Sequence, residues 1–165
     1  MNHAHTAQRP LLTWRGKVLP DWVDYNGHLR DAYYLLIFSL ASDSLMDHIG
    51  LDEAGRQATG HSLFTLECHL NFVHEVKAAA AVEVYTQILA HDKKRLHIAQ
   101  SLHLQGAEPP LAANELMLLN VELEGPKSAV FAASVLPHVE RLAALHASLP
   151  KPKFTGRVIA LPGQG

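Results

Sequence analysis

The feature that most constrains the fold of this chain is a series of four long segments with strand-like alternation and short connections. They cover residues 61–72, 81–91, 95–104 and 111–123. In the third segment, Leu and Ile occupy one side of the strand almost without exception, which is typical of a strand with one buried face. Connections this short favour antiparallel strands, because parallel neighbours need a crossover of about a dozen residues or more.

One long helical pattern precedes these strands, at about residues 31–49. Its apolar side chains recur at helical spacing, and three further leucines widen the apolar face beyond a stripe: Tyr34, Ile37, Phe38, Ala41 and Leu45, with Leu35, Leu36 and Leu40. A helix that is apolar around most of its circumference is usually buried. We therefore expect an α+β fold in which a long antiparallel sheet wraps around a central helix. The other expected elements are a strand at 11–19, a loop at 52–60 and a helix at 134–148.

Length and composition fit one ordinary domain, residues 1–165, with a mobile tail at 1–10 and a C-terminal extension at 150–165. The N-terminus lacks the apolar core of a secretory signal, and no apolar stretch approaches the roughly 18–20 residues of a membrane span. The formal net charge of -2 gives no electrostatic case for binding nucleic acid or an anionic membrane. We expect a cytoplasmic protein that acts on a small molecule.

Twelve histidines raise the question of a metal site, but their spacing argues against one. The sequence has no His-Glu-x-x-His motif and no cysteine pair, and His97 and His103 lie about 20 Å apart along one strand. It also lacks the Gly-x-Ser-x-Gly motif and the glycine-rich phosphate loops. Cys68, in the middle of an expected strand, is typical of a buried, inert thiol. We therefore expect neither a metal nor a cofactor.

The chemically useful side chains gather just before the long helix, in the segment PDWVDYNGH at residues 20–28. Asp24, Asn26 and His28 lie within five residues of one another. A helix start offers unpaired backbone N–H groups, which suit an oxyanion or a polarised carbonyl. A carboxylate beside such donors can act as a nucleophile or a general base. The alternative is an Asx turn in which Asp24 or Asn26 caps the helix, and the residues alone leave both readings open.

The segment WVDYNGHLRDAYYLLIF, residues 22–38, resembles the opening of hotdog-fold acyl-CoA thioesterases of the 4-hydroxybenzoyl-CoA thioesterase class. The resemblance extends over roughly residues 11–123. DYNGH, LECHLNFVHEVK, DKKRLHI and ANELMLLNV are most similar to the subfamily that hydrolyses betainyl-CoA in carnitine breakdown. The chain departs from the class at Arg30, where many members have Asn, and at residues 77–79, where Gly-Asp is usual. The resemblance implies the hotdog fold and hydrolysis of a small acyl-CoA by a homodimer or homotetramer.

The resemblance also implies roles for individual residues. Asp24 matches the catalytic Asp of the class, and its motif is completed by Asn26, Gly27 and His28. The donors that polarise the thioester carbonyl are matched by the backbone N–H groups at the helix start, those of Leu29, Arg30 and Asp31.

Other side chains are candidates for binding the substrate. Glu67, His69 and Asn71 alternate onto one strand face, which either is solvated, forms a subunit interface, or presents Glu67 and His69 to the substrate. A betaine-like acyl group is a permanent cation, which carboxylates and aromatic faces attract. The candidate aromatic faces are Trp22, Tyr25, Tyr33 and Phe64, of which Tyr33 and Phe64 fit a core role at least as well. The candidates for binding CoA phosphates are Lys93, Lys94 and Arg95, for which a solvated turn is the alternative.

Two other functions stay open on the sequence. Asp24, Asn26 and His28 resemble the Asp-x-Asn…His signature of hotdog enoyl-CoA hydratases, in which Asp and His are one residue further apart and Pro follows the Asn. A non-catalytic acyl-CoA-binding protein is the third class. Such sensors normally carry a DNA-binding segment, for which 165 residues leave little space. An acyl-CoA thioesterase is the main expectation.

Overall fold

The computed structural model describes residues 9–163. Of the mobile tail expected at residues 1–10, residues 1–8 lie outside this range. The elements are β1 (Leu11–Lys17), the 3-10 helix η1 (Pro20–Trp22), α1 (Asp31–His48), α2 (Glu53–Thr59), β2 (His61–Phe72), β3 (Ala81–His91), β4 (Arg95–Leu104), β5 (Pro110–Glu122), β6 (Lys127–Ser128) and α3 (Leu136–His146). The bounds of the four long strands agree with the sequence prediction to within one residue. The predicted loop at 52–60 is wrong, because α2 forms there with Asp52 accepting a hydrogen bond from the Gly55 N–H.

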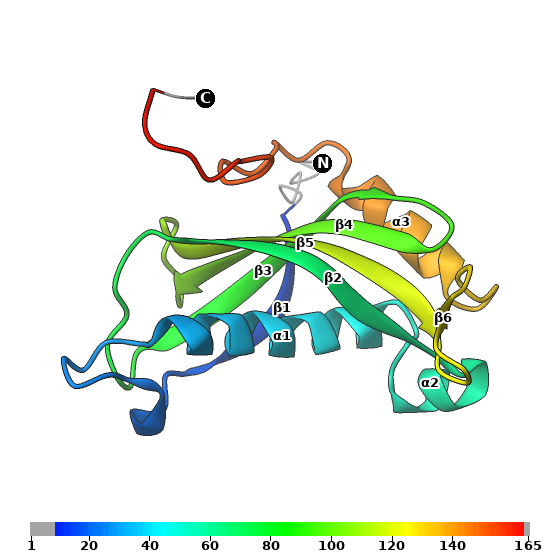
Figure 1. Ribbon diagram of the computed structural model, residues 1–165, viewed down its shortest axis with the longest axis horizontal. Helices are drawn as coiled ribbons and strands as arrows, with labels where there is room; N and C mark the ends of the chain where they lie inside the picture. Colours follow the sequence, from blue (N-terminus) through cyan, green and yellow to red (C-terminus); the bar gives the residue numbers. More distant parts are fainter. Residues whose placement is uncertain (1–8, 164–165) are drawn as a thin grey trace, which may run out of the picture.

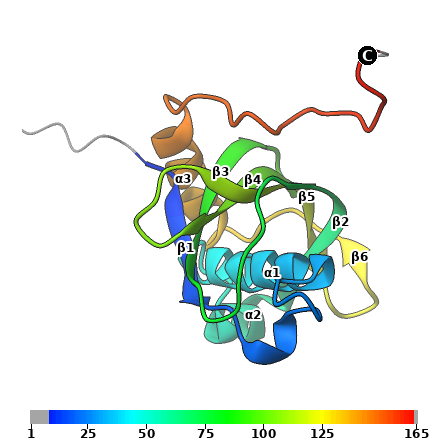
Figure 2. The same cartoon turned by 90° about the vertical axis from the view of Figure 1, so that its left-hand side faces the viewer.

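The long strands form one antiparallel sheet in the order β1-β3-β4-β5-β2, with β6 paired to β5. The sheet arches over α1, which lies along one of its faces (Figure 1). The segment after α3 crosses the opposite face, from the side of β1 towards the side of β2 (Figure 2). This arrangement confirms the predicted α+β fold, a long antiparallel sheet wrapped around a helix.

The hydrophobic core lies between α1 and the sheet in two clusters. The first surrounds the N-terminal half of α1, with Ile37 and Phe38 at its centre, and the second surrounds Leu45 and Ile49 near the C-terminal end. The expectation that α1 is buried around most of its circumference is wrong for a single chain, because Leu35 and Leu36 are exposed. The sheet covers one side of the helix and leaves the other side open.

β2 is the edge strand nearest to that open side, and within residues 9–163 no strand pairs with its outer edge. Its apolar side chains Phe64, Leu66 and Phe72 are exposed, Leu66 to 56%. Cys68 is exposed as well, so the predicted buried thiol is wrong. Because no strand in the described part of the chain covers the outer edge of β2, side chains along it stay accessible in the single chain.

Candidate active site

Asp24 lies in a tight turn between η1 and α1. The turn is closed by two backbone hydrogen bonds, from the Asp24 N–H to the His28 carbonyl (2.8 Å) and from the Gly27 N–H to the Asp24 carbonyl (3.0 Å). Gly27 has φ +77°, a left-handed conformation that glycine adopts without strain. The Asp24 Oδ1 accepts hydrogen bonds from the Asn26 N–H (2.8 Å) and the His28 N–H (3.1 Å), whereas its Oδ2 has no hydrogen-bond partner in the described part of the chain. One carboxylate oxygen is thus held and the other is available to a substrate.

The turn also favours the ionised form of this carboxylate. The His28 N–H lowers the pKa of Asp24 below its ordinary value; partial burial opposes this shift, and the Asn26 N–H adds to it. A carboxylate is the form that a nucleophile or general base requires, so Asp24 is in that form at neutral pH.

The start of α1 supplies fewer free donors than the sequence suggests. The Leu29 N–H donates to the Val76 carbonyl (2.7 Å) and the Arg30 N–H to the Trp22 carbonyl (3.0 Å). Among the three expected donors, the Asp31 N–H therefore remains without an acceptor in residues 9–163. Of the alternative, the Asx turn forms, because the Asp24 Oδ1 accepts the Asn26 N–H, but the helix begins after Arg30 without a side-chain cap, so neither Asp24 nor Asn26 caps it.

A cleft of about 270 Å³ adjoins this helix start. α1 contributes Asp31 and Tyr34 to its wall, and the end of β2 and the residues after it contribute Phe72, His74 and Glu75. The Tyr34 hydroxyl donates to the His74 carbonyl (3.3 Å), and the ring of Tyr34 meets that of Phe72 edge to face, with centroids 5.2 Å apart. Burial, followed by the charge of Glu75, raises the pKa of Tyr34, so its hydroxyl stays protonated at neutral pH.

A contact between the side chains of His28 and Glu75 connects the Asp24 turn with this cleft. The Nε2 of His28 lies 3.3 Å from the Oε2 of Glu75, while the backbone N–H of His28 donates to Asp24. Trp22 and Tyr33 stack on each other nearby in sequence, with ring centroids 5.8 Å apart and planes at 18°. The structure therefore brings together the Asp24 turn, Trp22, Tyr33 and the helix start, whereas Tyr25 is 93% exposed.

The structure places Glu67 and His69 on a different face of the sheet. They pair with Met117 and Glu115 of β5, whereas the intervening Leu116 belongs to the core cluster on the α1 side. Glu67 and His69 line a separate cavity of about 320 Å³ beneath the C-terminal segment. Their alternation onto one face is as predicted, but within one chain that face lies opposite α1.

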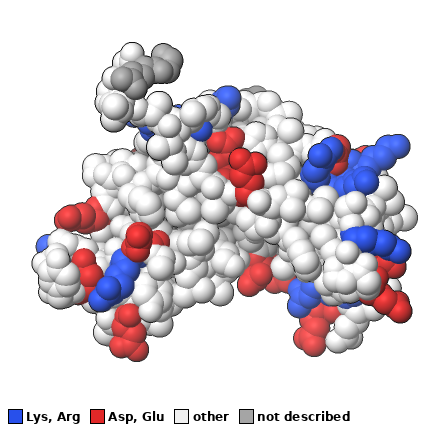
Figure 3. All heavy atoms as spheres, viewed as in Figure 1, with Lys and Arg blue, Asp and Glu red and all other residues white. Residues whose placement is uncertain are grey.

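The basic residues Lys93, Lys94 and Arg95 form the hairpin between β3 and β4. The carbonyls of Lys93 and Lys94 accept hydrogen bonds from the Phe131 and Asn120 N–H groups. Arg95 donates to Asp92 and holds the pKa of that carboxyl at about 2. Basic side chains gather over this hairpin at the right-hand end of the molecule, whereas α1 begins at the left-hand end (Figures 1 and 3).

Residues 9–163 lack two kinds of feature. No group of three or more His, Cys, Asp and Glu side chains there is arranged to hold a metal ion. No helix in that range is long and apolar enough to cross a membrane.

Sequence reasoning missed five residues of the cleft: Tyr34, Phe72, Val73, His74 and Glu75. The sequence shows that a polar pair, His74-Glu75, follows the second long strand. It does not show that the end of this strand lies beside the start of α1, because that proximity is tertiary.

Curated proteins of known activity match most of this chain. The family model of the thioesterase-like superfamily matches residues 18–139. A betainyl-CoA thioesterase from Pseudomonas aeruginosa is 62% identical over 152 residues, which are 92% of this chain and 96% of that protein. An L-carnitine dehydrogenase/betainyl-CoA thioesterase from Rhizobium meliloti is 36% identical over 151 residues, and the match spans 30% of that longer protein.

Two solved structures are similar as well. A candidate thioesterase from Pseudomonas putida KT2440 is 48% identical, with a TM-score of 0.81 and coverage of 93% of this chain and 98% of the other. A hypothetical protein from Staphylococcus aureus, solved in complex with CoA, is 26% identical, with a TM-score of 0.84 and coverage of 93% and 97%.

Proposed function

The chain belongs to the thioesterase-like superfamily, and on that premise we propose that it is an acyl-CoA thioesterase whose substrate is betainyl-CoA. The observation that carries the proposal is the 62% identity, over nearly the full length of both chains, to a protein of that activity. The geometry supports it, because the turn before α1 leaves Oδ2 of Asp24 open and the helix start leaves the Asp31 N–H free of protein acceptors.

The proposed reaction uses these two groups. The thioester oxygen accepts a hydrogen bond from the Asp31 N–H at the positive end of the α1 dipole, which stabilises negative charge on that oxygen. Asp24 either removes a proton from the attacking water or attacks the carbonyl carbon itself, forming an anhydride that water then cleaves. In both routes the C–S bond breaks and CoA leaves as a thiol. In the general-base route the water oxygen enters the acid. In the anhydride route water attacks the Asp24 carbonyl, so its oxygen stays in Asp24 and the acid carries the former Asp24 oxygen. A single turnover in 18O-labelled water separates the routes, because only the anhydride route leaves label in Asp24. Neither route requires a metal or a cofactor.

We also propose that the working unit is at least a homodimer formed through the outer edges of two β2 strands. The unpaired edge carries the exposed apolar residues Phe64, Leu66 and Phe72, and exposed apolar edges favour pairing with another chain. Antiparallel pairing would bring the basic hairpin of one protomer towards the α1 start of the other. In that arrangement the CoA phosphates of the neighbouring site are bound by the hairpin residues Lys93, Lys94 and Arg95. The proposed location of the enzyme and its substrate is the cytoplasm.

A thioester panel tests the activity. The protein is offered betainyl-CoA, butyryl-CoA, benzoyl-CoA and crotonyl-CoA, and the released thiol is followed with a chromogenic reagent, with and without a metal chelator. We expect the largest kcat/KM for betainyl-CoA, unchanged by the chelator. Loss of crotonyl-CoA absorbance without thiol release would instead indicate a hydratase, and ligand-induced stabilisation without turnover would indicate a binding protein.

Sedimentation velocity of the wild type and Leu66→Asp tests the dimer. The charge added at the β2 edge is expected to dissociate it.

A further inference from the structure

The cleft beside the start of α1 has the chemistry to bind a quaternary ammonium group. Two aromatic rings, Tyr34 and Phe72, and two carboxylates, Asp31 and Glu75, line it. Aromatic faces and carboxylates are the groups that attract a cation which cannot donate a hydrogen bond. We infer that this cleft holds the trimethylammonium group of the substrate and that Glu75 is the residue that selects for its charge; this inference rests on the proposed function.

The covalent structure of the acyl group limits where its charge can lie. In a betainyl thioester, one methylene separates the quaternary nitrogen from the carbonyl carbon. The charge therefore lies about 2.5 Å from the reacting carbon, given C–C and C–N bonds of about 1.5 Å. If the Asp31 N–H binds the carbonyl oxygen, the cation falls within the cleft that Asp31 lines. At about 270 Å³ the cleft is small for a ligand site, which suits a short acyl group.

Glu75 differs from the other carboxylate of the cleft in its bonding. The Oδ1 of Asp31 accepts the Ala32 N–H (2.8 Å) in the first turn of α1, so that side chain is held against the helix. The Glu75 side chain is 76% exposed and has one polar partner, the Nε2 of His28, at 3.3 Å. It therefore has a free oxygen and the freedom to face a cation in the cleft.

The experiment separates charge from shape by using a neutral substrate of the same outline. In 3,3-dimethylbutanoyl-CoA a carbon atom replaces the quaternary nitrogen, so the two acyl groups fill the same space. The measured quantity is the ratio of kcat/KM for betainyl-CoA to kcat/KM for this isostere. We expect Glu75→Gln to lower the ratio about tenfold, because Gln keeps the size and polarity of the side chain but lacks the charge. Phe72→Leu, which removes one aromatic face, is expected to lower it about threefold.

Two further variants sharpen the result. Glu67→Gln removes the carboxylate on the other sheet face, and Glu140→Gln removes an exposed carboxylate from α3. We expect neither to change the ratio. A ratio that falls in Glu67→Gln and not in Glu75→Gln would overturn the inference in favour of Glu67. An equal fall of both kcat/KM values in Glu75→Gln would also overturn it, since that is the effect of losing support for His28.

Failure of the proposed function has a different signature. A wild-type protein that hydrolyses neither thioester, or that hydrolyses the isostere better, contradicts the betainyl-CoA assignment itself. A wild-type protein that prefers betainyl-CoA, with an unchanged preference in Glu75→Gln, contradicts only the role of Glu75. Thermal unfolding of each variant, followed by circular dichroism, shows that the compared proteins are folded.

Discussion

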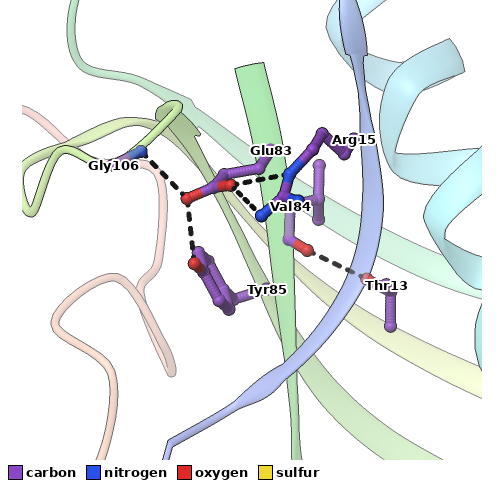
Figure 4. Close-up of polar contacts among 6 residues, drawn as sticks. All are labelled: Thr13, Arg15, Glu83, Val84, Tyr85 and Gly106. Carbon is purple, nitrogen blue, oxygen red and sulfur yellow. Dashed lines mark hydrogen bonds and ion pairs between the residues drawn. The ribbon is translucent and has the colours of Figure 1, made fainter. Parts of the chain in front are cut away.

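Two carboxylates, one on each side of the sheet, illustrate how the same group serves stability or function. Glu83 of β3 is 3% exposed and every oxygen is occupied. Its Oε2 accepts from Nε (3.1 Å) and Nη2 (3.0 Å) of Arg15, and its Oε1 accepts from the Tyr85 hydroxyl (2.9 Å) and the Gly106 N–H (3.2 Å) (Figure 4). Asp24, at the start of α1, has one oxygen held by two N–H groups and the other without a protein partner in residues 9–163.

The difference lies in whether the protein or a ligand completes the bonding of the charge. Burial raises the pKa of Glu83, but the Gly106 N–H, the Tyr85 hydroxyl and Arg15 outweigh it and hold this pKa below its usual value. Such a carboxylate has no oxygen lone pair left for a substrate. Removing it leaves four hydrogen-bond donors without their acceptor. The pKa of Asp24 is also lowered, yet its bonding is half complete. Open bonding capacity, more than burial, therefore distinguishes the candidate active site from the structural polar cluster.

The largest expected effect comes from Asp24→Asn. The amide keeps an oxygen that can accept the Asn26 and His28 N–H groups, so the turn is retained, but it is neither a base nor a nucleophile. We expect kcat/KM for betainyl-CoA to fall about 10³-fold, while the free energy of unfolding changes by less than about 0.5 kcal/mol. Steady-state kinetics and urea denaturation measure the two quantities. Activity within a few-fold of the wild type would remove Asp24 from the mechanism.

The next largest effect is expected for Glu83→Gln, which should lower stability and leave activity nearly unchanged. The NH2 group of Gln replaces a carboxylate oxygen and faces groups that are themselves donors, and Arg15 loses its negatively charged partner. We therefore expect the free energy of unfolding to fall by about 3 kcal/mol. Because Glu83 lies away from the cleft, kcat of the folded protein is expected to stay within about twofold of the wild type. Glu122→Gln is the matched control. Glu122 pairs with Lys127 at the surface (3.2 Å), and losing such a pair costs at most about 1 kcal/mol. Equal costs for the two substitutions would contradict the contrast.

Local patterns in the sequence predict most of the framework and the centre of the candidate site. The long strands and α1 are predicted well because their periodicity is local, and the Asp24 turn because its residues are adjacent. Position within the sheet is not local, so Cys68 was expected to be buried although it lies on the edge strand. Glu75 and Tyr34 are 41 residues apart in the chain and share a cleft only because β2 ends beside the start of α1. A lone Glu83 between two valines gives no signal of the four donors that surround it.

The smallest effect concerns pH and again belongs to the polar groups away from the cleft. His146 of α3 is buried, its Nδ1 accepts the Ile88 N–H (2.9 Å), and burial lowers its pKa. Below about pH 6.5 the unfolded chain therefore binds a proton at this residue, whereas the folded protein binds it less readily. Stability is lost as pH falls through this window, at no more than about 1.4 kcal/mol per pH unit for one proton.

His146→Gln isolates this effect, because Gln can accept the Ile88 N–H but does not titrate. We expect the free energy of unfolding to fall further between pH 7.5 and pH 5.5 in the wild type than in the variant, by about 1 kcal/mol. The two proteins share every other residue, so all other contributions cancel in the difference. Since the pKa of Asp24 is lowered, its carboxylate stays ionised over the same range, so the fold weakens while the candidate catalytic group keeps its charge. Equal pH dependence in the two proteins would show that His146 is protonated as readily in the folded state as in the unfolded chain.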